Sequence, residues 1–148
     1  MTATQTTGRA TKRNRNARRS LTSILTIIIA ALAAELVWAI AVPLAGIELV
    51  VPQAGTTVGP AAIATSVVLA GLAAWGLRAF MARSRTGLNA WTAIGAVVLA
   101  LSLGGPALSG ASGPVLGVLE IMHVVVGIAL IVGLRLSARH GLTQQTNA

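Results

Sequence analysis

The sequence predicts an all-α fold, an integral membrane antiparallel four-helix bundle with its N- and C-termini in the cytoplasm. Three observations predict it: a strongly apolar composition, four apolar runs long enough to cross a bilayer, and a one-sided distribution of basic residues. Of the 148 residues, 55% are hydrophobic and only 9% are charged, whereas about 25% are charged in an ordinary soluble domain. A soluble globular protein is therefore excluded.

The four apolar runs cover residues 21–42, 61–81, 90–108 and 114–134. A hydrocarbon layer of about 30 Å needs about 20 helical residues at about 1.5 Å per residue, and each run meets that length. The connections are short, so consecutive helices run in opposite directions. A basic tail over residues 1–20 and a second tail over residues 135–148 lie outside the runs, and neither is long enough to fold as a domain.

The first run follows a tail that should be disordered, because residues 1–20 are rich in Thr, Arg and Asn and have no apolar pattern. A basic segment before an apolar run is also typical of a signal peptide, with Ala31 and Ala33 as small residues at a cleavage site. The continuous run is too long for the usual apolar region of such a peptide. We therefore expect a membrane helix, with cleavage as the alternative.

Turns and small residues shape the rest of the predicted bundle. Pro43 either kinks the first helix or ends it, because residues 47–51 are apolar again. The loops after the first and third runs are rich in Pro and Gly, which favour turns. Small residues four apart allow helix backbones to approach in lipid. The pairs of this kind are Ala30 with Ala34, Ala70 with Ala74, and Gly113 with Gly117.

Basic residues occur only at the ends of the runs that we assign to the cytoplasm. Eleven Lys and Arg against three Asp and Glu give a formal charge of +8, and the two loops on the other side hold none of the eleven. Cytoplasmic segments carry an excess of Lys and Arg, so both termini are predicted in the cytoplasm of a bacterial plasma membrane. The arginines expected at the membrane surface are Arg13, Arg15, Arg18, Arg19, Arg83, Arg85, Arg135 and Arg139.

The expected partners are the lipid bilayer and, at the cytoplasmic face, its anionic head groups. A basic side chain near an anionic surface contributes about 1 kcal/mol to adhesion. Arg78, near the end of its run, has a side chain long enough to reach the head groups. One Phe, three Trp and no Tyr leave little surface for stacking on bases, so no nucleic acid is expected. A second copy of the chain or another membrane protein is the candidate protein partner.

Three ionisable residues inside the runs form the candidate proton- or substrate-binding site: Glu35, Glu120 and His123. At about 1.5 Å per residue, they lie about 10, 9 and 14 Å below the outer boundary, so they can meet inside the bundle. A charge in hydrocarbon costs roughly 2.5 to 3.5 kcal/mol on insertion scales, so these groups should pair or share protons. Such a cluster would relay protons or bind a cationic substrate. Further polar contacts would come from Ser102, Thr65 and Ser66.

The alternative interpretation is that these residues only hold helices together, at about 0.6 kcal/mol for each hydrogen bond. The chain has no cysteine, which excludes thiolate and iron–sulfur chemistry. No metal is expected, because no spacing motif supports a site, and no cofactor is expected either. We find no catalytic motif and expect no enzyme. Trp38 and Trp91, near the ends of runs, are expected to be interface anchors, and Trp75 is expected to pack against other side chains.

The segment Ala34-Glu35-Leu36-Val37-Trp38 in the first of four helices is similar to the small multidrug resistance transporters. That resemblance implies a cation/proton antiporter in which Glu35 exchanges protons for cationic drugs. It covers one helix only, and the additional Glu120 and His123 depart from the pattern of those transporters. Their orientation also varies when their charge bias is near zero, whereas this chain has a strong bias.

Four segments carry a second resemblance: residues 34–38, residues 89–93, residues 101–106 and Met122-His123. Together they resemble a family of uncharacterised four-helix membrane proteins from actinobacteria, classed as a domain of unknown function, over about residues 20–136. The resemblance implies this architecture and no activity. Two main hypotheses follow: a transport or proton-coupled accessory protein centred on the Glu/Glu/His cluster, or a structural or interaction protein whose polar residues fix helix packing.

Overall fold

The structure, a computed structural model, describes residues 4–143 except residues 54, 83 and 85, and describes side chains between residues 20 and 137. It is helical apart from one short hairpin. Its elements are α1 (Thr4–Ala39), the π-helix η1 (Ile40–Leu44), β1 (Val50–Val51), β2 (Thr56–Thr57), α2 (Pro60–Met81), α3 (Gly87–Ser102), α4 (Gly104–Leu108) and α5 (Gly113–Thr143).

Four helical segments in the described part of the chain are long and apolar enough to cross a membrane. They are Ser20–Leu44, Pro60–Met81, Gly87–Leu108 and Gly113–Ser137. Each contains one of the predicted runs and extends it by a few residues at most. The all-α fold and the four packed apolar helices are therefore confirmed.

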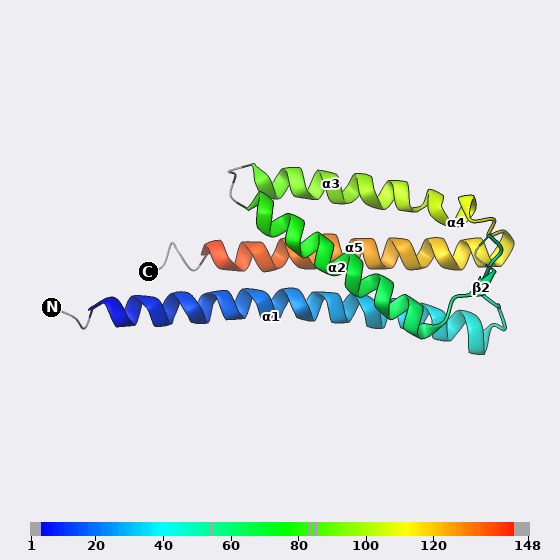
Figure 1. The fold of residues 1–148 in the computed structure, drawn as a ribbon, viewed down its shortest axis with the longest axis horizontal. Helices are drawn as coiled ribbons and strands as arrows, with labels where there is room; N and C mark the ends of the chain where they lie inside the picture. The colour runs from blue at the N-terminus through cyan, green and yellow to red at the C-terminus, as the bar shows by residue number, and fades with distance from the viewer. Residues whose placement is uncertain (1–3, 54, 83, 85, 144–148) are drawn as a thin grey trace.

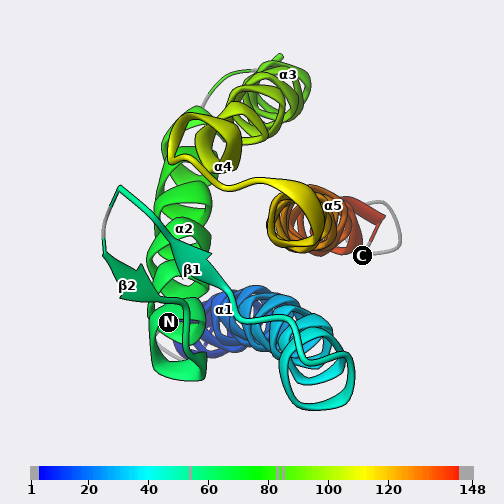
Figure 2. The ribbon, with the colours of Figure 1, turned by 90° about the vertical axis from the view of Figure 1, so that its right-hand side faces the viewer.

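The four long helices lie side by side, and α2 crosses the bundle diagonally (Figure 1). The start of α1, the end of α5 and the connection from α2 to α3 lie at one end, which we call the terminal end. The β1–β2 hairpin and α4 lie at the other, the hairpin end. In the view along the bundle, the helices form a ring in the order α1, α2, α3, α5, so that α1 and α3 are each flanked by α2 and α5 (Figure 2). Helix α5 therefore packs on both α1 and α3.

The expectation of a disordered tail over residues 1–20 is corrected from Thr4 onward. Helix α1 begins at Thr4 and continues without a break into the apolar span. A helix that has nucleated in the span adds one backbone hydrogen bond per further residue, so its extension is much easier than a new start. This part of the chain contains no Pro and several Arg, Lys and Ala, which favour helix. Helix α5 likewise extends beyond the predicted residue 134, to Thr143.

Pro43 does not end the first span. It lies within η1, where the helix widens by one residue per turn. Proline has no N–H and clashes with the preceding turn, which favours such a local widening. The N–H of Ala45 donates to the carbonyl of Ile40, five residues back, at 3.0 Å. Of the two alternatives for Pro43, a continued helix is thus the one observed.

The hairpin after η1 has no counterpart in the sequence prediction. Strand β1 pairs antiparallel with β2, with Val50 opposite Thr57. Gly55 in the connecting turn has a φ of +59°, which only glycine adopts without strain. Just after β2, the carbonyl of Val58 accepts a hydrogen bond from Trp38 Nε1 at 3.0 Å. This bond ties the hairpin to α1.

Small residues at helix contacts follow the prediction in α1 only. Ala30 and Ala34 are both fully buried, as expected. Ala70 is exposed, and a Cβ added at Gly117 would meet nothing within 4 Å. The predicted contacts at Ala70 and at Gly117 are therefore wrong.

Other glycines make the close helix contacts. A Cβ at Gly71 would lie 2.7 Å from Ile27 Cγ1 of α1. A Cβ at Gly127 would lie 2.5 Å from Leu99 Cδ1 of α3. A Cβ at Gly133 would overlap the side chain of Thr26 in α1. Glycine at these positions allows α1, α2, α3 and α5 to approach closely.

Candidate functional site

Arg78, in the last turn of α2, joins three helices at the terminal end. Its Nη1 donates to the carbonyl of Leu134 and to the hydroxyl of Ser137 in α5, each at 3.0 Å. Its Nη2 donates to the hydroxyl of Ser23 in α1 at 3.2 Å. Ser23 and Ser137 are only 1% and 2% exposed. The expectation that Arg78 reaches outward to head groups is thus wrong, because buried serines and a carbonyl bind its guanidinium inside the bundle.

The sequence contained a signal for this site. Ser23 and Ser137 are polar residues close to the ends of their apolar spans, and both ends are on the same side as the end of α2. An arginine near that level can satisfy several acceptors at once, since its guanidinium carries five N–H donors. The length of the arginine side chain alone does not reveal which acceptors lie within its reach.

A second arginine, Arg135, links α5 to α3. Its Nη1 donates to Thr92 Oγ1 at 3.1 Å, and its Nη2 lies 3.5 Å from Asn89 Oδ1. Arg135, one of the arginines expected at the membrane surface, is half-buried between two helices. The other predicted surface arginines have side chains outside the described residues: Arg13, Arg15, Arg18, Arg19, Arg83, Arg85 and Arg139.

Trp91 is a packing residue and not the expected interface anchor. It is 2% exposed, and its Nε1 donates to the carbonyl of Ala74 in α2 at 3.1 Å. A buried indole N–H requires such an acceptor. Trp91 therefore fixes α3 against α2 near the terminal end.

Glu35 lies on the side of α1 that faces away from α5. Thr26 marks the α5-facing side, because it meets Gly133. Glu35 follows Thr26 by nine residues, which at about 100° per residue places it on the opposite side of the helix. Its carboxylate has no hydrogen bond or ion pair with another described residue.

Glu120 lies on the side of α5 that faces α3. Gly127 and Ile131 mark that side, because they meet Leu99 and Gly95 of α3. Glu120 precedes Gly127 by seven residues, or two helical turns, and so shares this side. Its carboxylate also has no hydrogen bond or ion pair within the described part of the chain.

The expected cluster of Glu35, Glu120 and His123 is therefore corrected: the described residues contain no buried Glu/His cluster. All three side chains are half-buried, and the two acids project from different sides of the bundle. Among the described residues, no three His, Asp or Glu side chains lie close enough to hold a metal ion. The expected cluster depends on similar depth along the helices, but depth alone does not fix the direction in which a side chain projects.

Two of the other predicted polar contacts, Ser102 and Thr65, bond within their own helices. Ser102 Oγ donates to the carbonyl of Leu99 at 2.8 Å, and Thr65 Oγ1 donates to the carbonyl of Ala61 at 2.7 Å. Both hydroxyls thus have a hydrogen-bond acceptor in their own helix, as serine and threonine commonly do in membrane helices.

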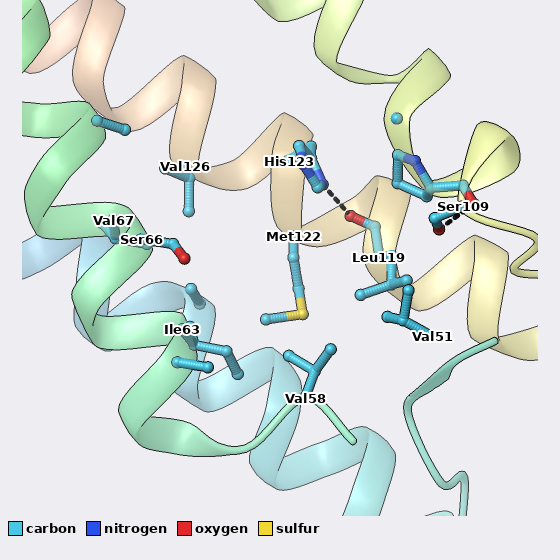
Figure 3. Close-up of a pocket in the computed structure, with 15 residues that line it drawn as sticks. Val51, Val58, Ile63, Ser66, Val67, Ser109, Leu119, Met122, His123 and Val126 are labelled. Carbon is cyan, nitrogen blue, oxygen red and sulfur yellow. Dashed lines mark hydrogen bonds between the residues drawn. The ribbon is translucent and has the colours of Figure 1, made fainter. Parts of the chain in front are cut away.

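A cavity of about 430 Å³ lies at the hairpin end, between α2, α4 and α5. Its walls are mainly aliphatic, with Ile63 and Val67 from α2 and Met122 and Val126 from α5 (Figure 3). Ala34 of α1 also lines it. Because α2 crosses the bundle diagonally, it lies away from α4 at this end (Figure 1).

Three polar side chains line the cavity: Ser66, Ser109 and His123. The Ser109 hydroxyl donates to the carbonyl of Pro106 at 2.7 Å. His123 Nδ1 lies 2.7 Å from the carbonyl oxygen of Leu119. A carbonyl only accepts, so this contact assigns the hydrogen to Nδ1 and leaves Nε2 as the second ring nitrogen. The Ser66 hydroxyl points toward the space between α2 and α5 and has no hydrogen-bond partner among the described residues.

These features define a multi-pass membrane protein with four packed transmembrane helices. The family model described as "Family of unknown function (DUF6069)" matches residues 14–140 of the chain. The chain therefore belongs to the DUF6069 family. No curated protein and no solved structure gives a significant match.

Proposed function

We propose that this chain is a non-enzymatic protein of the bacterial plasma membrane with a structural or interaction role, and that it is not a proton-coupled transporter. The observation that carries the proposal is the Arg78 site, where one side chain bonds to α1 and α5 from α2. Arg135 and Trp91 make further bonds between helices. The polar groups that bond across helices inside the spans thus hold the bundle together.

The positions of the two acids support the same proposal. A carrier that couples protons to a substrate needs a titrating group that both can reach in turn. Glu35 lies on the side of α1 away from α5, whereas Glu120 lies on the side of α5 that faces α3, so one substrate site does not serve both. A structural or interaction role, with a second copy of the chain or another membrane protein as the partner, does not require the two acids to meet.

A proton-flux assay tests the proposal. The purified full chain is reconstituted into vesicles that contain a pH-sensitive dye, and a potassium diffusion potential is imposed. We expect the same proton influx as in protein-free vesicles, for the wild-type protein and for the Glu35→Gln and Glu120→Gln variants. Faster influx in the wild-type protein that either variant abolishes would overturn the proposal.

The proposed orientation places the terminal end in the cytoplasm, as the distribution of basic residues favours. The chain has no cysteine, so a single introduced cysteine reports its own exposure. Ser84 and Ser112 are exposed residues in connections at the terminal end and at the hairpin end. In intact cells, an impermeant maleimide should label Ser112→Cys, whereas Ser84→Cys should react only after permeabilisation. The reverse labelling would contradict the proposed orientation.

We also infer that the residues before Ala34 stay in the mature protein. Ser23, Thr26 and Ile27 contact α2 and α5, so removal of this segment would expose those contacts. The intact mass of the membrane-extracted protein should include this segment. A mass that corresponds to a chain beginning near Ala34 would show that the segment acts as a signal peptide instead.

A further inference from the structure

We propose that the cavity at the hairpin end binds an amphiphile with a neutral hydroxyl head group and a hydrocarbon body, taken up from the surrounding lipid. A structural role for the bundle does not require such a ligand. The cavity volume of about 430 Å³ falls within the range of about 300–1,000 Å³ that is usual for small-molecule sites.

The opening of the cavity faces the hydrocarbon of the membrane. Its exposed lining residues on α2 and α4 all have small side chains: Ala62, Ser66, Ala70 and Gly105. The three on α2 are spaced four residues apart, so they form one continuous edge along the helix. Both helices belong to the apolar spans, so a molecule that enters here comes from the lipid.

The end of the cavity toward the aqueous side is covered by the hairpin. Val51 of β1 and Val58 just after β2 line the cavity there. The hydrogen bond from Trp38 to the Val58 carbonyl holds this part of the hairpin against α1. A water-soluble ligand would therefore meet a covered end, whereas a lipid-soluble one meets the open side.

The walls suit a hydrocarbon body. Ile63, Val67 and Met122 are each less than a tenth exposed, and they come from α2 and α5 on opposite sides of the cavity. Methionine has an unbranched, flexible side chain that adapts to different apolar shapes. An alkyl or isoprenoid chain can fill this space without an unsatisfied polar group.

The ring nitrogen of His123 that remains available selects a hydroxyl head group. Because Nδ1 of His123 bonds to Leu119, Nε2 is left to accept a hydrogen bond from the ligand. A neutral ligand hydroxyl can donate this hydrogen bond. Ser66 lies on the α2 wall of the cavity, whereas His123 lies on the α5 wall (Figure 3).

The depth and charge of the site exclude a charged head group. Ser66 lies about 9 Å below the start of α2, and His123 about 15 Å below the start of α5, at about 1.5 Å per residue. Among the described residues, no Lys, Arg, Asp or Glu lines the cavity. A charged head group at this depth would have no counter-charge, which is unfavourable in hydrocarbon.

Photoaffinity labelling tests this proposal. The probe is a hexadecanol analogue with a diazirine near the end of its chain, added to phosphatidylcholine vesicles that contain the full-length protein. After irradiation, mass spectrometry should place the label on α2 and α5 residues that line the cavity. Unlabelled hexadecanol should compete at roughly tenfold lower concentration than hexadecylamine or hexadecanoic acid. Equal or better competition by the amine or the acid would overturn the proposal, as would label spread over the lipid-facing helix surfaces.

Variants separate the head-group contacts from general lipid contact. His123→Phe keeps a ring of similar size but removes Nε2, and Ser66→Ala removes the hydroxyl. His123→Phe should lower specific labelling about fivefold, the effect of one lost hydrogen bond, whereas Ser66→Ala on the opposite wall should leave labelling unchanged. Ser102→Ala is the matched control, since Ser102 lies in a span but does not line the cavity, and it should label as the wild-type protein does.

A further variant keeps the test valid if His123→Phe does not fold. Ala70→Leu narrows the opening with an apolar residue at an exposed position, and unfolding temperature and tryptophan fluorescence report whether the bundle is intact. It should lower labelling at least threefold in a folded protein. Unchanged labelling in folded Ala70→Leu, or in folded His123→Phe, would overturn the proposal.

Discussion

The terminal end and the hairpin end of the bundle keep their helices together in different ways. At the terminal end, Arg78, Arg135 and Trp91 bond to neighbouring helices, and α5 lies close to α1 at Gly133. At the hairpin end, α2 and α5 enclose a cavity, and a Cβ at Gly117 of α5 would meet nothing within 4 Å. The same helix α5 therefore has a tightly packed half and a half with free space.

This difference indicates at which end of the bundle substitutions should affect stability. Apolar burial does not drive helix association in lipid, so close backbone contact and hydrogen bonds must do so. The hydrogen bonds between helices, and the close contact at Gly133, are found at the terminal end. Substitutions there should lower stability, whereas equivalent substitutions at the hairpin end should leave stability unchanged and affect only the cavity.

A pair of glycine substitutions in α5 should show the largest difference. Gly133→Ala places a Cβ against the side chain of Thr26, which is fixed by a hydrogen bond of its hydroxyl to the Thr22 carbonyl at 2.9 Å. Overpacking of this kind costs about 1–3 kcal/mol, and we expect the upper part of that range. Unfolding in detergent, followed by tryptophan fluorescence, measures the change.

The control for this prediction is Gly117→Ala in the same helix. Nothing lies within 4 Å of its new Cβ, so stability should be unchanged or rise by up to about 1 kcal/mol. The double variant Gly133→Ala/Thr26→Ala should recover part of the lost stability, because the obstructing atoms of Thr26 are removed. Equal effects of the two glycine substitutions would contradict the difference between the two ends.

Replacement of Arg78 should have the next largest effect. Arg78→Met keeps the side-chain length but removes three hydrogen bonds, to Leu134, Ser137 and Ser23. At about 0.6 kcal/mol for each interhelical bond in a membrane protein, the loss is about 2 kcal/mol. Arg135→Met removes two bonds, one of them at 3.5 Å, and should cost about 1 kcal/mol or less. Equal stability of wild-type protein and Arg78→Met would show that the site does not hold the helices.

The different outcomes for Arg78 and for the acids show how far sequence reasoning reaches. The spans were predictable to within a few residues, because length and hydropathy act along the chain and need no knowledge of neighbours. The direction of Glu35 and Glu120 was not, because it depends on which helix lies beside each face. Nothing in a single span fixes that neighbour: α5 packs on both α1 and α3 only in the folded bundle.

The cavity and the hairpin were unpredictable for a related reason. Ser66 was identified as a polar residue in the second span, yet its place at the edge of a cavity results from the diagonal path of α2. That path depends on the contact of Gly71 with Ile27 near the middle of α2 and of Trp91 with Ala74 near its end. Spacing within one helix does not reveal such crossing angles.

Trp91→Phe should have a smaller effect than the replacement of Arg78. The phenyl ring fills most of the buried space, but the bond from Nε1 to the Ala74 carbonyl is lost. We expect a loss of about 0.6 kcal/mol for the bond and somewhat more for the smaller ring. Trp38→Phe is the comparison at the hairpin end, where the lost bond to Val58 holds the hairpin and not a helix. It should leave unfolding of the helices unchanged and increase hydrogen exchange in the hairpin.

The smallest effect on stability is expected for Glu35→Gln and Glu120→Gln. Neither carboxylate bonds to another described residue, so removal of its charge breaks no contact that holds the helices. The unfolding free energy of either variant should stay within about 0.5 kcal/mol of the wild-type value, as for surface substitutions. A loss larger than that of Arg78→Met would mean that the acids, and not the arginine, hold the bundle together. The two acids would then be the structural residues, and the contrast between the two ends would fail.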